Sequence, residues 1–173
     1  LIAHLGFAAC VVGIVATSQY SVEHDLKMNP GDSRELAGYE FHFVAVVEVR
    51  GPNFVADEAR FEVTRDGVLV ASMTPQKRRY SASGSVMTEA AIDAGLFRDL
   101  YVAMGEPVGS SGAWAMRLHF KPLVRWMWLG AILMALGAFT SALDKRYRRQ
   151  REVVHSSGEA ALRQLGELAL LEE

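Results

Sequence analysis

Hydrophobic residues concentrate at the two ends of the chain, and the segment between them alternates apolar with polar positions. The C-terminal run, Leu123–Leu143, is apolar over about the 20 residues that a helix needs to cross a bilayer. Lys and Arg cluster directly after it, which marks the cytoplasmic end of a membrane helix. Arg125, Trp126 and Trp128 suit the headgroup level at its other end. We predict a transmembrane helix here, because a buried helix of a soluble protein would explain neither the length nor the flanks.

A second apolar run, Leu1–Ser18, is slightly short for a full span, and a few upstream residues would complete it. The chain begins with Leu rather than Met, so we expect either a processed start or the end of a longer polypeptide. A secretory signal is the rival interpretation, since residues 16–18 imitate a cleavage site, but no basic region leads the run. Gly6 and Gly13 would let a neighbouring helix approach closely. We predict a transmembrane helix at 1–18.

The segment between the two runs, residues 19–122, carries the pattern of β-strands. Residues 39–50 alternate apolar with polar side chains, and a Gly-Pro-Asn sequence ends that pattern. The turn Arg65-Asp66-Gly67 separates two further runs, 54–64 and 68–73, which should therefore pair antiparallel. Later strands are predicted at 99–104 and 114–120. The predicted inward face comprises Phe41, Phe43, Phe61, Val63, Trp114 and Leu118.

Several short strands with turns between them are typical of a small sandwich or barrel. The predicted fold class is therefore a membrane protein of the α+β type, with two transmembrane helices flanking an external antiparallel β domain. The four predicted parts are a helix at 1–18, the β domain at 19–122, a helix at 123–143 and a cytoplasmic basic tail at 144–173. In that tail Ser156 and Glu159 have capping-box spacing before a leucine-rich stretch, which predicts a short amphipathic helix that docks or frays.

Composition agrees with this organisation. The chain has 173 residues, is 50% hydrophobic, and carries a net charge of −2, so no nucleic-acid partner is implied. Cys10 is the single cysteine, which excludes an intrachain disulfide and any CxxC or CxxCH motif. The chain is therefore neither a c-type cytochrome nor a thiol oxidoreductase.

Candidate chemistry centres on His4. An ionisable side chain within a membrane helix by default faces a bundle interior, a polar path or a cofactor, and imidazole is a natural axial ligand for heme iron. A histidine near a helix end can equally serve only a structural role, and the sequence leaves both readings open. His24, His42 and His119 show no metal-binding spacing and are predicted to be surface strand residues.

Two groups of charged residues offer further candidate sites. The basic segment Gln76–Tyr80 is predicted to be a turn that meets lipid phosphates or an acidic partner, or simply a solvated loop. Glu89, Asp93 and Asp99 would suit acid–base chemistry, but no nucleophile or phosphate-binding loop accompanies them. The sequence therefore shows no self-contained active site.

Four stretches resemble a known family. They are Ala3-His4-Leu5-Gly6, Arg50–Asn53, Lys77–Tyr80 and the long segment MTEAAIDAGLFRDLYVAMGE at Met87–Glu106. Together they closely resemble the C-terminal part of the CcmF/NrfE heme lyase subunits of cytochrome c biogenesis, and the resemblance covers about Leu1 to Arg149.

The resemblance implies a polytopic membrane protein of the bacterial inner membrane with its β domain in the periplasm. Such proteins take heme from the chaperone CcmE and attach it to the CxxCH cysteines of apocytochrome c, together with a CcmH-type subunit. They also hold a heme b between two histidines on membrane helices, and His4 matches the second of these by its Ala-His-Leu-Gly setting.

Two departures from the family limit what this chain is expected to do alone. The tryptophan-rich WWD segment and the two external histidines that hold the incoming heme are absent from this sequence, so the piece by itself should not catalyse ligation. The tail after about Arg151 has no counterpart in the family pattern. The leading hypothesis is the C-terminal portion of a heme lyase subunit, with His4 as one axial ligand of heme b. The alternative is a two-span envelope protein whose β domain binds a protein partner and which holds no heme.

Overall fold

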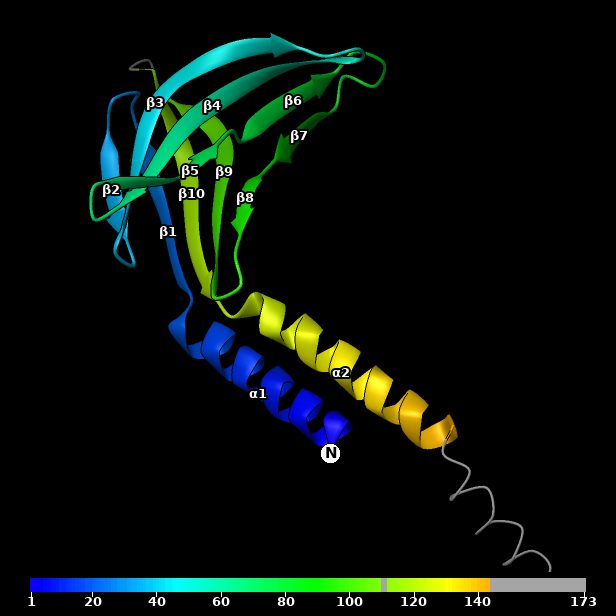
Figure 1. Ribbon diagram of the computed structural model, residues 1–173. Coiled ribbons are helices and arrows are strands. Elements are labelled where there is room, and N and C mark those ends of the chain that lie inside the picture. Colours follow the sequence, from blue (N-terminus) through cyan, green and yellow to red (C-terminus); the bar gives the residue numbers. More distant parts are fainter. Residues whose placement is uncertain (110–111, 144–173) are drawn as a thin grey trace, which may run out of the picture. The chain divides into compact units, whose positions relative to one another are not determined.

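The structure is a computed structural model that describes residues 1–109 and 112–143 (Figure 1). These residues form two helices and ten strands. In chain order they are α1 (Ile2–Tyr20), β1 (Val22–Met28), β2 (Ser33–Leu36), β3 (Tyr39–Arg50), β4 (Phe54–Arg65), β5 (Val68–Met73), β6 (Gln76–Tyr80), β7 (Val86–Glu89), β8 (Ala91–Ala94), β9 (Arg98–Val108), β10 (Ala113–Pro122) and α2 (Val124–Leu143).

The chain divides into two compact units. Of the described residues, 1–8 and 130–143 form the first unit, and Ala9–Leu129 form the second. The second unit contains all ten strands, which pair antiparallel in two sheets. One sheet has the order β1-β10-β9-β8, and the other has the order β2-β3-β4-β6-β7 with β5 paired to β4 (Figure 1). The predicted architecture, two long apolar helices flanking an antiparallel β sandwich, is confirmed.

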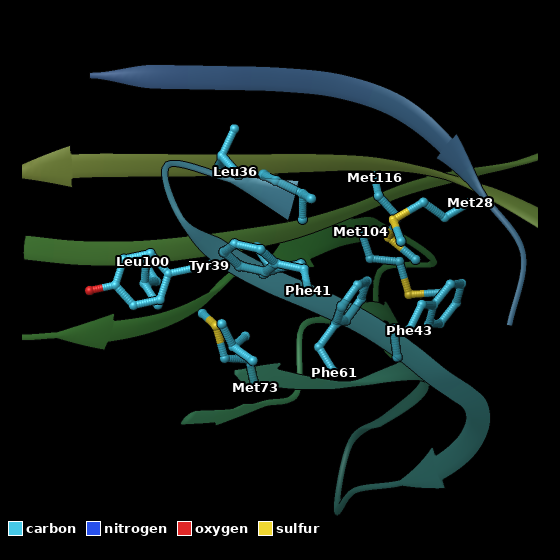
Figure 2. Packing of buried hydrophobic residues seen from close by; sticks show 14 residues of the cluster. Met28, Leu36, Tyr39, Phe41, Phe43, Phe61, Met73, Leu100, Met104 and Met116 are labelled. Carbon is cyan, nitrogen blue, oxygen red and sulfur yellow. The ribbon is translucent and has the colours of Figure 1, made fainter. Parts of the chain in front are cut away.

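The core lies between the two sheets. Phe43 on β3 stacks on Phe61 on β4, with ring centroids 4.9 Å apart and planes 6° from parallel. Figure 2 shows these rings pointing toward Met104 and Met116 from the other sheet. Each fully buried large apolar side chain contributes roughly 1.5–3 kcal/mol to folding. Of the six predicted core residues, five are fully buried, and Trp114 packs half-buried against the cluster.

A β-bulge corrects one detail of the predicted inward face. The alternation predicted Ala45 and Val47 on the same face as Phe43. The pairing of β3 with β4 shifts between Phe43 and Ala45: Phe43 pairs with Phe61, and Ala45 pairs with Arg60. Strand β3 therefore contains one extra residue at this point, which is a β-bulge. Val46 consequently packs against the core, opposite the fully buried Ala59.

The turn between β4 and β5 forms as predicted. Asp66 has φ 52° and Gly67 has φ 75°, and two successive residues in the left-handed region are the signature of the tight hairpin turn that suits twisted strands. The sequence pattern did not predict strands β1, β2, β7 and β8. Strand β2 pairs with β3 across a tight turn in which Ala37 has φ 52° and Gly38 has φ 77°, whereas β1 pairs with the distant strand β10.

The basic segment Gln76–Tyr80 is a strand, β6, so its interpretation as a turn or solvated loop is wrong. It pairs with β4 on one side and β7 on the other. Its charges are accommodated by neighbours: Lys77 forms an ion pair with Glu106, and Arg78 stacks on the ring of Phe54 at 4.5 Å. The side chain of Lys77 is consequently only 11% exposed.

Glycines set the close contacts of the two helices, as predicted. In the first unit, a Cβ added to Gly6 would lie 2.7 Å from the carbonyl oxygen of Gly130, and one added to Gly137 would lie 2.6 Å from the backbone nitrogen of Ala3. In the second unit, a Cβ added to Gly13 would lie 2.9 Å from the backbone nitrogen of Met127. Close backbone approach through small residues is characteristic of helix packing in membranes. Both helices are long and apolar enough to cross a bilayer.

We expect Phe61→Ala to lower the unfolding free energy of the domain 19–122 by about 3–5 kcal/mol, because it removes a buried ring and leaves a cavity beside Phe43. Arg79→Ala is the control, since Arg79 is exposed and a surface change costs within about 0.5 kcal/mol. Urea unfolding of the domain measures both. An unchanged midpoint for Phe61→Ala would contradict the assigned inward face.

A second prediction concerns the helix contact. Gly6→Leu should lower the thermal stability of the protein in detergent, because the added side chain meets backbone atoms of α2 that cannot move aside. Ala8→Leu places the same side chain on the same helix at an exposed position and should leave the melting temperature unchanged. Equal melting temperatures for the two variants would show that Gly6 is not at a helix contact.

Candidate functional site

His4 lies on an exposed part of α1. The face of α1 that packs on α2 in the first unit contains Ala3 and the buried Gly6, and the helical period turns His4 away from that face. Its neighbours one turn on are Phe7 and Ala8, and Phe7 is 61% exposed. No hydrogen bond to the His4 ring forms among residues 1–109 and 112–143. The imidazole is therefore available to a group supplied from outside the described residues.

This environment fits one axial ligand of a heme. A porphyrin presents apolar faces, and the exposed Phe7 beside His4 is apolar. Imidazole is also the donor type that low-spin heme iron takes. The described part of α1 and α2 offers one such donor, His4, so a second ligand would come from elsewhere.

A second candidate surface lies on the outward face of the β1–β10 pair. Asp25 accepts two hydrogen bonds from Arg117, from Nε at 2.6 Å and from a terminal nitrogen at 2.9 Å. Arg117 Nε also lies 3.5 Å from Glu23, which lies 3.4 Å from Nε2 of His119. The pKa of Asp25 is lowered chiefly by the hydrogen bond from Arg117, and the pKa of Arg117 is raised by the same bond. We call these four residues the β1–β10 charge cluster.

The prediction that the three external histidines are surface strand residues is wrong for His119. The residue is 8% exposed, and its ring packs edge-on against Tyr101 on β9 with centroids 4.8 Å apart. Burial lowers the pKa of His119, and the neighbouring Glu23 opposes that shift. His24 is exposed, whereas His42 is half-buried and its Nδ1 lies 3.0 Å from the hydroxyl of Ser33.

Beside the charge cluster is a hollow of about 650 Å³. Small residues lie along it, because Ala103, Gly105 and Ala115 carry little or no side chain. A Cβ on Gly105 would lie 3.1 Å from the carbonyl oxygen of Ala115, so the two strands approach closely there. Tyr101 and Arg117 also border the hollow. A shallow concavity with mixed charges at its edge suits contact with a protein surface.

The structure does not bring the carboxylates of Glu89, Asp93 and Asp99 together as an acid–base group. Glu89 on β7 lies 3.3 Å from Arg78, and Asp93 on β8 forms an ion pair with Arg98. Asp99 on β9 accepts a hydrogen bond of 3.1 Å from the backbone of Gly95. Each carboxylate therefore has its own local partner. The predicted basic cluster after Leu143 and the amphipathic helix of the tail lie outside the described residues.

Comparison with known proteins identifies the family. Residues 19–122 match the family model described as the CcmF C-terminal beta-sandwich. The chain is 51% identical over 165 residues to the cytochrome c-type biogenesis protein CcmF of Pseudomonas aeruginosa, covering 92% of this chain and 25% of that protein. The chain belongs to the CcmF family. The resemblance seen in the sequence is thereby confirmed.

Other relatives agree. CcmF of Escherichia coli is 49% identical over 148 residues, which cover 86% of this chain and 23% of that protein. NrfE of Haemophilus influenzae is 38% identical over 151 residues, which cover 87% of this chain and 24% of NrfE. A solved structure of cytochrome c heme lyase CcmF superposes on this chain with a TM-score of 0.64 and 22% sequence identity. The superposition covers 80% of this chain and 23% of the solved chain, and it supports the fold described above. The chain spans about a quarter of the length of these CcmF-family relatives.

The lowered pKa of His119 predicts a pH-dependent stability. Unfolded histidine has a pKa of about 6.5, so below that pH the unfolded chain binds a proton that folded His119 resists, and the unfolding free energy falls. We expect the melting temperature of the domain 19–122 to drop from about pH 7.5 to about pH 5.5, and to drop less in His119→Gln. The exposed His24 provides the control: His24→Gln should behave as the unaltered domain does. Equal drops in all three proteins would rule out His119 as the titrating group.

Proposed function

We propose that this chain is the C-terminal portion of a membrane heme lyase subunit that acts in cytochrome c maturation, in heme handling and in covalent attachment of heme to apocytochrome c. The observation that carries the proposal is the 51% identity to a cytochrome c-type biogenesis protein CcmF over 92% of this chain. The chain spans about a quarter of that relative, so its own share of the activity is support for heme binding and docking rather than the ligation step itself.

His4 contributes one axial ligand to a heme b in this proposal. Two structural observations support that role: the imidazole is exposed on α1, and its face of the helix is apolar. When bound, heme would supply an iron that accepts an imidazole donor, and His4 is the residue of this chain that would hold it. The packed opposite face of α1, with Ala3 and Gly6 against α2, fixes the direction in which His4 projects.

The proposed location is the inner membrane of a bacterial cell, with α1 and α2 spanning it and residues 19–122 in the periplasm. The basic residues between positions 144 and 151 support this orientation, because Lys and Arg accumulate on the cytoplasmic side of a span. In this proposal heme is attached to apocytochrome c on the same side of the membrane, so the β domain and its proposed partners would face the same compartment.

The β domain acts as a scaffold and docking surface in this proposal. Its partners are the heme chaperone CcmE, a CcmH-type subunit and apocytochrome c, in addition to heme and the bilayer. We assign protein contact to the β1–β10 charge cluster and the adjacent hollow, because paired charges there border a concave surface lined by small residues. The alternative function, a two-span protein-binding module without heme, uses the same surfaces and differs in the role of His4.

His4→Ala in the full-length protein should abolish the heme b spectrum, because low-spin iron loses an axial ligand and the neighbouring side chains are apolar. Added imidazole should partly restore heme content and cytochrome c maturation by entering the vacated position. His4→Met replaces imidazole with a thioether, so heme should be retained with a higher reduction potential. Heme content and reduced-minus-oxidised absorbance of purified variants, at matched protein levels, measure these effects.

Two controls accompany His4→Ala. Val12→Ala alters an exposed position on the same helix without removing a donor, and His42→Ala removes a histidine from the β domain. Both should keep a normal heme spectrum. Unchanged heme in His4→Ala would reject the ligand assignment and favour the alternative function.

A further inference from the structure

The tip of the β8–β9 hairpin is apolar and exposed. The two residues at the tip, Leu96 and Phe97, are 56% and 64% exposed. Two-residue hairpin tips favour Asn, Asp and Gly, which tolerate the turn geometry and stay hydrated. Leucine and phenylalanine at this place leave apolar surface in water without any gain in turn chemistry. Their exposure therefore points to an apolar partner outside the domain.

The tip is held in a defined conformation. The backbone nitrogen of Gly95 donates to the carbonyl oxygen of Arg98 at 2.8 Å and to Asp99 Oδ1 at 3.1 Å. Arg98 in turn donates to the backbone carbonyl of Asp93 at 3.0 Å and pairs with its carboxylate. A Cβ on Gly95 would lie 2.9 Å from the carbonyl oxygen of Arg98, so the turn closes tightly. The two apolar side chains consequently project from a rigid base.

The tip lies beside the beginning of α2, within the unit Ala9–Leu129. The backbone nitrogen of Leu123 donates to the carbonyl oxygen of Phe97 at 3.0 Å. The Phe97 ring faces the indole of Trp126 with centroids 6.4 Å apart and planes tilted by 42°. The apolar tip is thus continuous with the first turn of a membrane-spanning helix.

The beginning of α2 has the composition of a membrane boundary. Trp128 is 69% exposed, and the basic residues Lys121 and Arg125, which precede it in the sequence, are also exposed. The last turn of α1 lies next to the beginning of α2, because the hydroxyl of Thr17 donates to the carbonyl oxygen of Pro122 at 2.7 Å. Tyr20, at the end of α1, is 70% exposed. Tryptophan and tyrosine with flanking cations mark the level of lipid headgroups.

We propose that Leu96 and Phe97 insert into the boundary between the headgroups and acyl chains of the bilayer, next to Trp126. The β domain then contacts the membrane through this hairpin as well as through its two helical connections. The occupant of the apolar surface is lipid, because the surface is continuous with α2 and bordered by tryptophan and basic side chains. The proposal rests on α2 spanning the membrane and is independent of heme binding at His4.

Spin labels test the insertion. Cysteine is introduced singly as Leu96→Cys and Phe97→Cys in full-length protein in which Cys10 and any other cysteine have been replaced by serine. Met87→Cys is the matched control, because Met87 on β7 is 57% exposed. Met87 precedes Leu96 by nine residues along β7 and β8, which corresponds to roughly 30 Å of extended chain. The labelled proteins are reconstituted in phospholipid nanodiscs. Collision of each label with oxygen, which partitions into lipid, and with a water-soluble nickel chelate is measured.

We expect the ratio of oxygen to nickel accessibility to be several-fold higher at positions 96 and 97 than at 87. A ratio at 96 and 97 equal to that at 87 would show that the tip stays in water and would overturn the proposal. Low accessibility to both reagents would show that another protein segment covers the tip, and would overturn it equally. Heme content of the same samples, unchanged from the parent protein, separates this result from any failure of the His4 assignment.

Discussion

The antiparallel pairing of β1 with β10 is the constraint on which the rest of the second unit depends. These strands come from the two ends of the β domain, and their register places Val22 opposite Phe120. The end of α1 and the beginning of α2 must therefore leave the domain next to each other, where Thr17 bonds to the carbonyl of Pro122. A domain inserted between two membrane helices needs this closure, because both connections have to reach the same face of the bilayer.

The sequence predicted the elements whose signals are local. Residues 39–50 form a strand with the predicted bounds, and Asp66 and Gly67 form the predicted turn, because alternation and turn chemistry act over a few residues. The sequence pattern did not predict strand β1, although Leu26 and Met28 pack in the core. Its partner β10 lies far along the chain, so no turn between the two strands could indicate the pairing. The charged strand β6 was not predicted for a different reason: it is stabilised by an acidic and an aromatic neighbour on other strands, Glu106 and Phe54.

The candidate sites divide in the same way. His4 could be selected from the sequence because an ionisable residue in an apolar helix is conspicuous by type. The burial of His119 could not, because it is produced by Tyr101 on β9, a neighbour that only the sheet register supplies. Leu96 and Phe97 lie in the family-like stretch Met87–Glu106, but the sequence predicted no hairpin there. The contact of Phe97 with Trp126 depends on the pairing that brings the β8–β9 hairpin to the beginning of α2.

The same β1–β10 pairing that closes the domain also positions the β1–β10 charge cluster. Asp25 and Arg117 are directly opposite in the register, and their ion pair is solvent-exposed, so it adds little to folding stability. The positive charges of Lys27 and Arg117 offset the negative charges of Glu23 and Asp25. Burial lowers the pKa of His119 and so favours its neutral form. A partner at this face would therefore meet a pattern of donors and acceptors beside a concave floor rather than a strong net field. Recognition of that kind depends on the geometry of the strand pair, so the proposed docking surface depends on the same pairing that closes the domain.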